Sequence, residues 1–178
     1  VHTANQNSAG LETRNQAKTF IYAFLYGAGD AKIGSIVGGS AKVGRQLKDK
    51  FLANTPSLQK LKDNVAEASQ RGYLKGLDGR KVYVRSEHSA LNTLLQSAGA
   101  IVMKKALIIL DAYAKLWGLD YEFVGNIHDE FQIEVKESDA DKLGMLAVAS
   151  MQAAGHQLNL RCELDGEFKI GNNWADTH

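Results

Sequence analysis

Apolar residues recur at helical spacing near the start of the chain and predict a helix from about Glu12 to Tyr26. Its apolar side is formed by Phe20, Ile21, Phe24 and Leu25. Polar residues four positions apart form a slowly drifting stripe on the other side, because each such step overshoots a full turn by about 40°. The stripe consists of Arg14, Lys18, Tyr22 and Tyr26.

Two further helices are predicted before and after a short turn-rich region. Thr55 and Pro56 are typical of an N-cap and a first turn, and that helix is expected to end near Gly72. Its apolar side is formed by Leu58, Leu61, Val65 and Ala68. The apolar-rich run 89–117 lacks proline and predicts a long, largely buried helix that ends at Gly118.

Two β-hairpins are predicted from alternating β-prone runs. Asp78-Gly79 lies between short β-prone runs in segment 73–85, a strong hairpin signal. Runs 121–127 and 131–135 are expected to pair around a tip formed by His128, Asp129 and Glu130. A helix over 138–158 and a last strand over 160–168 complete an α+β fold.

Charge is divided unevenly along the chain. Residues 1–62 hold nine Lys/Arg and three Asp/Glu, residues 63–118 hold eight and five, and residues 119–178 hold four and twelve. A basic segment suits phosphate contact and an acidic segment suits a divalent cation, although two ordinary solvated surfaces fit the same pattern. The single cysteine, Cys162, and the lack of a leader-like segment indicate a reducing cytoplasm, and no stretch is expected to be long enough to span a membrane.

The stripe and the acidic tip are the two candidate sites. Two cations followed by two phenols suit a polyphosphate next to an aromatic base, although a solvated surface helix also fits. Asp129 and Glu130 provide oxygen ligands for magnesium, although acidic turns are common. His128 is expected to be a turn residue rather than a ligand, because magnesium prefers oxygen.

Four segments in order resemble motifs of family A DNA polymerases. R-N-Q-A-K-T-F-I-Y-A-F-L-Y-G at 14–27 resembles the fingers-helix motif, and I-H-D-E at 127–130 resembles the palm motif. Between them, L-D-G-R-K-V-Y-V-R and L-N-T-L-L-Q-S-A-G-A resemble segments that contact primer-template DNA. V-H-T-A-N-Q at the start and G-N-N-W-A-D-T-H at the end resemble the branch of short-tailed phages. The resemblance implies helical fingers over 1–72 and part of an antiparallel palm sheet over 73–178.

The resemblance also implies roles in nucleotide binding. His2, Arg14 and Lys18 would contact the triphosphate of the incoming deoxynucleotide, and Tyr22 would pack near its sugar and base. In this family a tyrosine at the Tyr22 position goes with easy acceptance of dideoxynucleotides. Lys18 would also offset charge on the leaving pyrophosphate.

Roles in DNA and metal binding follow in the same way. Asp129 would bind the catalytic metals, two Mg²⁺ ions in the complete enzyme, and Glu130 would support Asp129 or the primer end. The reaction implied is attack of the primer 3′ hydroxyl on the α-phosphate, in phage DNA replication within the bacterial host cytoplasm. The residues implied in contacts with primer-template DNA are Tyr26, Gly27, Arg80, Asn92, Gln96 and His128.

In the family, the other metal-binding aspartate lies in a motif that would come just before position 1. The thumb and the proofreading exonuclease come before that motif. We therefore expect this chain alone to have no useful polymerase activity and to need an upstream polymerase portion as a partner. A palm sheet without its neighbouring strand would have an exposed edge, which predicts association with that portion or self-association.

Two other functions remain open. A nucleic-acid-binding module without chemistry would bind DNA in a salt-sensitive way and be indifferent to magnesium and nucleotide. A magnesium-dependent phosphohydrolase would need further carboxylates at the tip, where the nearest in sequence are Asp120, Glu122 and Glu134. Glu134 would lie roughly 13 Å from Glu130 along a strand, too far to share an ion.

Overall fold

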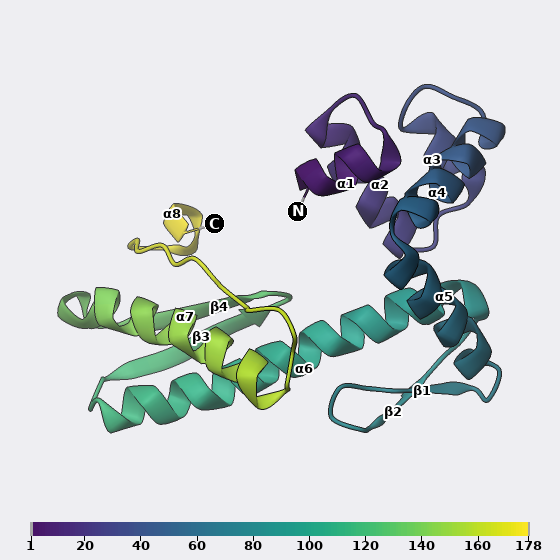
Figure 1. Cartoon of the computed structure of the whole chain (residues 1–178). Coiled ribbons are helices and arrows are strands. Elements are labelled where there is room, and N and C mark those ends of the chain that lie inside the picture. The colour runs from purple at the N-terminus through teal and green to yellow at the C-terminus, as the bar shows by residue number, and fades with distance from the viewer. Residues whose placement is uncertain (1, 178) are drawn as a thin grey trace. The chain divides into compact units, whose positions relative to one another are not determined.

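A computed structural model describes residues 2–177, so Val1 and His178 of the two end segments lie outside the described residues. The chain forms two compact units (Figure 1). The first comprises the residues up to Gly76 together with Arg80–Leu95, and the second comprises Leu77–Gly79 and the residues from Gln96 onward. Helices and two antiparallel two-stranded sheets make up the described residues, which confirms the α+β prediction.

The first unit is mainly helical. Its first two helices meet at Thr13, which caps α2 reciprocally with Gln16: each side-chain oxygen accepts from the other's backbone N–H at 3.1 Å. This confirms the predicted first helix, with its start at Arg14. The elements of this unit are α1 (His2–Ala9), α2 (Arg14–Leu25), α3 (Asp30–Ser35), α4 (Ala41–Asn54), α5 (Pro56–Ser69), β1 (Tyr73–Lys75), β2 (Lys81–Tyr83) and the start of α6 (Glu87–Leu116).

Three phenylalanines join α2 to α4 in the core of this unit. Phe20, Phe24 and Phe51 are buried, and their ring centroids lie 5.2 to 6.0 Å apart. Two of the three contacts are edge-to-face, an arrangement that aromatic rings favour. The packing holds the apolar side of α2 against α4 and leaves the polar side exposed to solvent.

The helix predicted after Thr55 forms as α5, with Thr55 at its N-cap position and Pro56 in its first turn, as predicted. The Thr55 hydroxyl donates to the Phe51 carbonyl at 2.6 Å and makes no side-chain cap to α5. On the predicted apolar side of α5, Val65 is buried and Ala68 packs against the same cluster, whereas Leu61 is 37% exposed. The helix ends at Ser69, and Gly72 follows with a φ of +82°.

The predicted hairpin over segment 73–85 is confirmed as β1 and β2. Tyr73 pairs with Tyr83, Leu74 with Val82 and Lys75 with Lys81. The Gly76 N–H donates to the Arg80 carbonyl at 2.9 Å, and Gly79 has a φ of +85°. Leu74 and Val82 face the core beside α5 and α6.

The second unit contains the other hairpin, packed against helices. The apolar residues of the hairpin pack with Leu110 and Ala114 of α6 and with Leu143 of α7. Figure 1 shows α7 beside this hairpin in the second unit. Its elements are the end of α6, β3 (Tyr121–Ile127), β4 (Glu130–Val135), η1 (Glu137–Asp139), α7 (Ala140–Gln157) and α8 (Trp174–Thr177).

The hairpin tip is shorter than predicted. Glu130 is the first residue of β4 and pairs with Ile127, so the turn is His128–Asp129 alone. His128 takes a φ of +54°, which a non-glycine residue rarely adopts. Asp129 and Glu130 therefore differ in setting: one is in the turn, and the other is fixed in a strand.

The predicted last strand over 160–168 is wrong, because this segment forms no strand. It packs against α7 instead. A Cβ at Gly144 would lie 2.3 Å from the Phe168 ring, and a Cβ at Gly155 would lie 3.1 Å from the Leu164 side chain. The two glycines leave room for these side chains on the helix, and the segment is held by that packing rather than by a β-ladder.

The long helix α6 forms as predicted, and Gly118 follows it with a φ of +64°, but the helix is not largely buried. Ile108 is 69% exposed and Leu116 is 81% exposed. An 18-residue window of α6 has a mean hydropathy of 1.5 and is 28% buried, so α6 is long and apolar enough to cross a membrane. The expectation that no stretch has this length and composition is therefore wrong, although core helices of soluble proteins meet the same criterion.

A hydrogen bond ties the start of β3 to α6 and predicts an unusual titration. The Tyr121 hydroxyl donates to Asp111 Oδ1 at 2.7 Å. Partial burial and this bond raise the pKa of Tyr121 to about 12, from 10.0. Because the pKa is higher in the folded state, protonated Tyr121 stabilises the fold fully below pH 10, and this contribution is lost as the pH rises toward 12. In an ultraviolet titration at the phenolate band, Tyr121→Phe should lose the transition near pH 12, and an unchanged titration curve would contradict this.

Candidate functional site

The polar stripe of α2 lies on the exposed side of the helix. Arg14 and Lys18 are exposed, and Tyr22 and Tyr26 are 49% and 58% exposed. Because the opposite side of α2 is fixed by the phenylalanine cluster, the two cations and two phenols project from a rigid element. This placement agrees with the predicted face.

His2 of α1 is brought to this stripe. Its ring centroid lies 6.3 Å from that of Tyr22, with the planes tilted by 55°. Its Nδ1 atom is buried and makes no hydrogen bond to any group in residues 2–177. Since buried polar atoms are normally paired, this nitrogen retains an unused donor or acceptor position beside Tyr22.

The turn after α2 requires glycine at position 27. Gly27 has a φ of +75°, and a Cβ there would lie 2.7 Å from the His88 carbonyl oxygen. The Gly27 N–H donates to the Phe24 carbonyl and the Ala28 N–H to the Ala23 carbonyl. The turn that follows Tyr26 is therefore closely packed against the first turn of α6.

Lys48 of α4 binds the residues that follow this turn, Ala28 and Asp30, and the sequence did not predict this contact. We call this contact the Lys48 clamp. The Lys48 Nζ donates to the Ala28 carbonyl at 2.6 Å and lies 2.9 Å from Asp30 Oδ1. Only 22% of the Lys48 side chain is exposed. The hydrogen bond from Lys48 holds the pKa of Asp30 below its usual value of 3.8. The contact joins residues twenty positions apart, so no local pattern could have indicated it.

This clamp predicts an acid-sensitive stability. A carboxylate whose folded pKa is lowered stabilises the fold above the unfolded pKa and loses that stabilisation as the pH falls below it. We expect Lys48→Met to reduce the loss of stability below about pH 3.8, because Asp30 then lacks the hydrogen bond that contributes most to lowering its pKa. Lys32→Met, at an exposed lysine of α3, is the matched control. Denaturant unfolding as a function of pH measures both, and equal acid sensitivity in the two variants would refute the clamp.

The residues expected to contact primer-template DNA are spread over both units. In the first, Arg80 is exposed at the end of the β1–β2 turn and Asn92 is half-buried in α6. In the second, Gln96 is exposed in α6 and His128 is exposed at the turn between β3 and β4. Their roles stay predictions.

The acidic turn borders a hollow in the second unit. Asp129 is exposed, whereas Glu130 is half-buried and accepts a short hydrogen bond from the Gln132 side-chain amide. The Gln132 oxygen accepts in turn from the Thr177 hydroxyl at 3.3 Å. Gln132 was missed because alternation along β4 identified it only as a polar position. Asp129, Glu130 and Gln132 line a hollow of about 1300 Å³ between β4, α7 and the C-terminal segment.

No group of three or more His, Cys, Asp or Glu side chains in residues 2–177 is arranged to hold a metal ion. Asp129 offers the oxygen donor that magnesium prefers, so the turn fits such an ion as one ligand among several supplied by substrate, water or another chain. The carboxylates that a phosphohydrolase would need do not converge there. Glu122 and Glu134 pair across the far end of the hairpin, and Asp120 lies 3.1 Å from Lys136.

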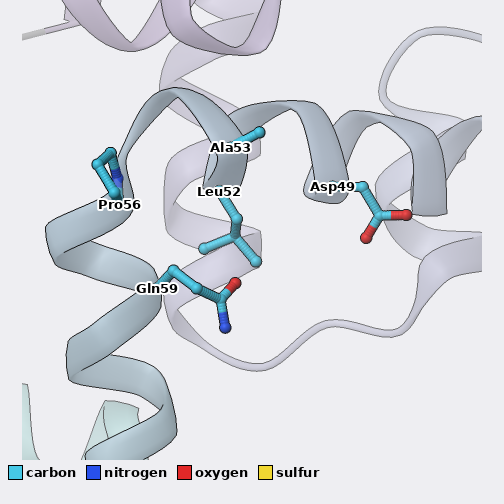
Figure 2. Close-up of a pocket in the computed structure, with 5 residues that line it drawn as sticks. All are labelled: Asp49, Leu52, Ala53, Pro56 and Gln59. Carbon is cyan, nitrogen blue, oxygen red and sulfur yellow. The ribbon is translucent and has the colours of Figure 1, made fainter.

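A second crevice lies where α4 meets α5 (Figure 2). It has a volume of about 340 Å³, and it includes none of the predicted site residues. The Gln59 amide at its edge donates to Asp63 at 2.7 Å. The lining residues are Asp49, Leu52, Ala53, Pro56 and Gln59.

The chain is similar to known polymerases over its whole length. The sequence model of DNA polymerase family A matches residues 1–176. The DNA-directed DNA polymerase of Escherichia phage Phieco32 is 45% identical over 185 residues, which cover 100% of this chain and 30% of the relative. The DNA-directed DNA polymerase of Escherichia phage T7 is 44% identical over 200 residues, covering 100% and 28%. DNA polymerase I of Bacillus caldotenax is 28% identical over 176 residues, covering 92% and 20%.

A solved structure shares the fold. The POL domain of Pol1 from M. smegmatis, in complex with DNA primer-template and dNTP, matches with a TM-score of 0.71 at 23% identity. The match covers 79% of this chain and 27% of that chain. The chain thus spans less than a third of the length of the relatives it matches.

Proposed function

The chain belongs to DNA polymerase family A, and from this membership we propose that it is the carboxyl-terminal part of a phage DNA-directed DNA polymerase. The observation that carries the proposal is the exposed stripe of α2, with His2 packed beside Tyr22. In the complete enzyme, a deoxynucleoside monophosphate would be transferred from a dNTP to the 3′ hydroxyl of a primer, as directed by a template.

The stripe suits the incoming nucleotide. Arg14 and Lys18 would bind its phosphates through charge-assisted hydrogen bonds, and His2, whose ring lies beside Tyr22, would add a third contact. Tyr22 would pack against the sugar and base. Because Lys18 projects from a fixed helix, its charge would already be in place when negative charge develops on the leaving pyrophosphate.

The acidic turn suits the metals of the same reaction. Asp129 would be their ligand from this chain, and Glu130, held by Gln132 and indirectly by Thr177, would support it or the primer end. Two magnesium ions, when bound, stabilise the attacking and leaving oxygens. Asp129 would keep its carboxylate free, since it is exposed in the turn.

The DNA would be contacted from both units. Tyr26 and Gly27, in the turn held between Lys48 and His88, would lie by the templating base. In this proposal residues 1–72 form the fingers and residues 73–178 form part of the palm. The contacts with primer and template would come from Arg80, Asn92, Gln96 and His128.

An upstream portion of the polymerase would supply the second metal-binding aspartate, the thumb and the exonuclease. This chain alone would then have no useful activity, because one carboxylate cluster cannot hold two metals productively. Association with that portion would use the exposed edge of the hairpin that carries Asp129, because an unpaired strand edge can pair with another strand. The same edge would permit self-association. The complete enzyme would act in the cytoplasm of the bacterial host.

Primer extension tests the proposal. Magnesium and the four deoxynucleotides are supplied to the chain alone and to its mixture with a separately produced upstream portion that contains the other aspartate. Extension in the mixture and none with the chain alone is expected. No extension in either case, with DNA binding that weakens steeply with salt, would replace the proposal by a nucleic-acid-binding module without chemistry.

A further inference from the structure

The outward face of the β1–β2 hairpin combines aromatic and basic side chains. Tyr73 lies directly opposite Tyr83, and Lys75 lies directly opposite Lys81. Because side chains alternate along a strand, these four residues share one face, here called the tyrosine–lysine face. The other face is apolar and buried, with Leu74 2% exposed. The hairpin therefore has a defined inside, and its outside is left to solvent or a ligand.

We propose that the tyrosine–lysine face binds single-stranded DNA, namely unpaired template bases next to the primer-template duplex. This inference rests on the proposed function, since it assumes that the chain binds a primer-template. None of the four residues was given an individual role by the sequence. Lys81 and Tyr83 belong to the segment 77–85 that resembles a primer-template contact, and the inference adds which face of the hairpin and which form of the DNA are involved.

The charge of the hairpin suits a phosphate backbone. Segment 71–85 contains five Lys/Arg residues and one Asp. Arg71 Cζ lies 5.3 Å and Lys81 Nζ lies 4.8 Å from the centroid of the Tyr73 ring. Cation–π contacts of this kind hold the two positive groups at the surface beside the ring. A DNA backbone that runs along the hairpin would therefore contact Arg71 and Lys81 in positions that are already fixed.

Tyr83 distinguishes single-stranded DNA from a duplex. Its side chain is 75% exposed, the most exposed of the chain's large aromatic residues described here. A base can stack on such a ring only when it is free of its own neighbours, because bases inside a duplex are already stacked on one another. Cationic grooves with exposed aromatic rings are typical of proteins that bind single strands without strong sequence preference.

Fluorescence anisotropy of the 178-residue chain tests the inference. Two labelled DNAs of equal paired length are compared: a blunt duplex and a primer-template with an unpaired 5′ template extension. We expect Tyr83→Ser to weaken binding of the extended DNA by about 5- to 150-fold, the range measured for loss of one base–aromatic stack. Binding of the blunt duplex should not change. Tyr83→Phe keeps the ring and should bind both DNAs like the unmodified chain.

The lysines are tested by salt dependence. Replacing Lys75 or Lys81 with Gln should reduce the slope of log K against log salt for the extended DNA by about 0.7 per lysine. Lys42→Gln, at an exposed lysine of α4 outside this face, should leave the slope unchanged.

The outcomes separate the two proposals. If the unmodified chain binds duplex DNA but Tyr83→Ser affects both DNAs equally or neither, the inference is overturned and the proposed function stands. If the unmodified chain binds neither DNA, the proposed DNA-binding role of this chain fails, and the inference fails with it.

Discussion

Gly44→Ala is expected to destabilise the first unit by about 1–3 kcal/mol, the usual cost of overpacking a well-packed site. A Cβ at Gly44 would lie 1.9 Å from the Asp30 carbonyl oxygen and 2.6 Å from the Gly34 backbone nitrogen. Both obstacles are backbone atoms of α3, so no side chain can move aside. The helices α3 and α4 would have to separate, and the contact of Lys48 with Asp30 would weaken with them.

The sign of this effect is what makes the test specific. Alanine in place of glycine within an open helix usually stabilises by up to about 1 kcal/mol. Gly99 of α6 is such a position, because a Cβ there would meet nothing within 4 Å. We therefore expect Gly99→Ala to stabilise the second unit, in contrast to Gly44→Ala.

Hydrogen exchange followed by mass spectrometry measures each unit by itself. Amides of α3 and α4 should exchange faster in Gly44→Ala, and amides near position 99 should exchange more slowly in Gly99→Ala. Unchanged exchange in α3 and α4 would show that these helices are less closely packed than the structure has them.

Local patterns predicted the elements that carry most of the candidate site. The helix α2 was readable because its apolar and polar sides separate at helical spacing. The β3–β4 hairpin was readable because its apolar residues alternate. The exposed stripe of α2 and the position of Asp129 at a turn followed from these patterns, since each depends on neighbours within a few residues.

Contacts between distant segments decided the rest. The segment 160–168 has strand-like residues, yet Gly144 and Gly155 of α7 leave room for Phe168 and Leu164, and packing prevails over pairing. The turn 128–129 places a non-glycine residue at positive φ, which no composition rule indicates. Lys48 reaches the turn after α2 from another helix. None of these contacts leaves a periodic signal in the sequence.

Asp129→Ala should lower magnesium-dependent primer extension by the reconstituted polymerase roughly 10³-fold or more. A metal ligand whose loss costs several kcal/mol of transition-state stabilisation has an effect of this size. Glu130 cannot replace Asp129, because its carboxylate is fixed in β4 by Gln132. Steady-state extension rates over a magnesium titration measure the loss, and excess magnesium should not restore the rate fully.

Asp120→Ala is the matched control for this loss. Asp120 is an exposed carboxylate that precedes β3, at the opposite end of the hairpin from Asp129, and it lies 3.1 Å from Lys136. Its removal changes the net charge by the same amount and should leave the extension rate unchanged. Primer-template binding should be similar in both variants, since an exposed acidic residue does not attract a polyanion. Equal extension by Asp129→Ala and Asp120→Ala would mean that the turn is an ordinary acidic hairpin end and that the metals are held elsewhere.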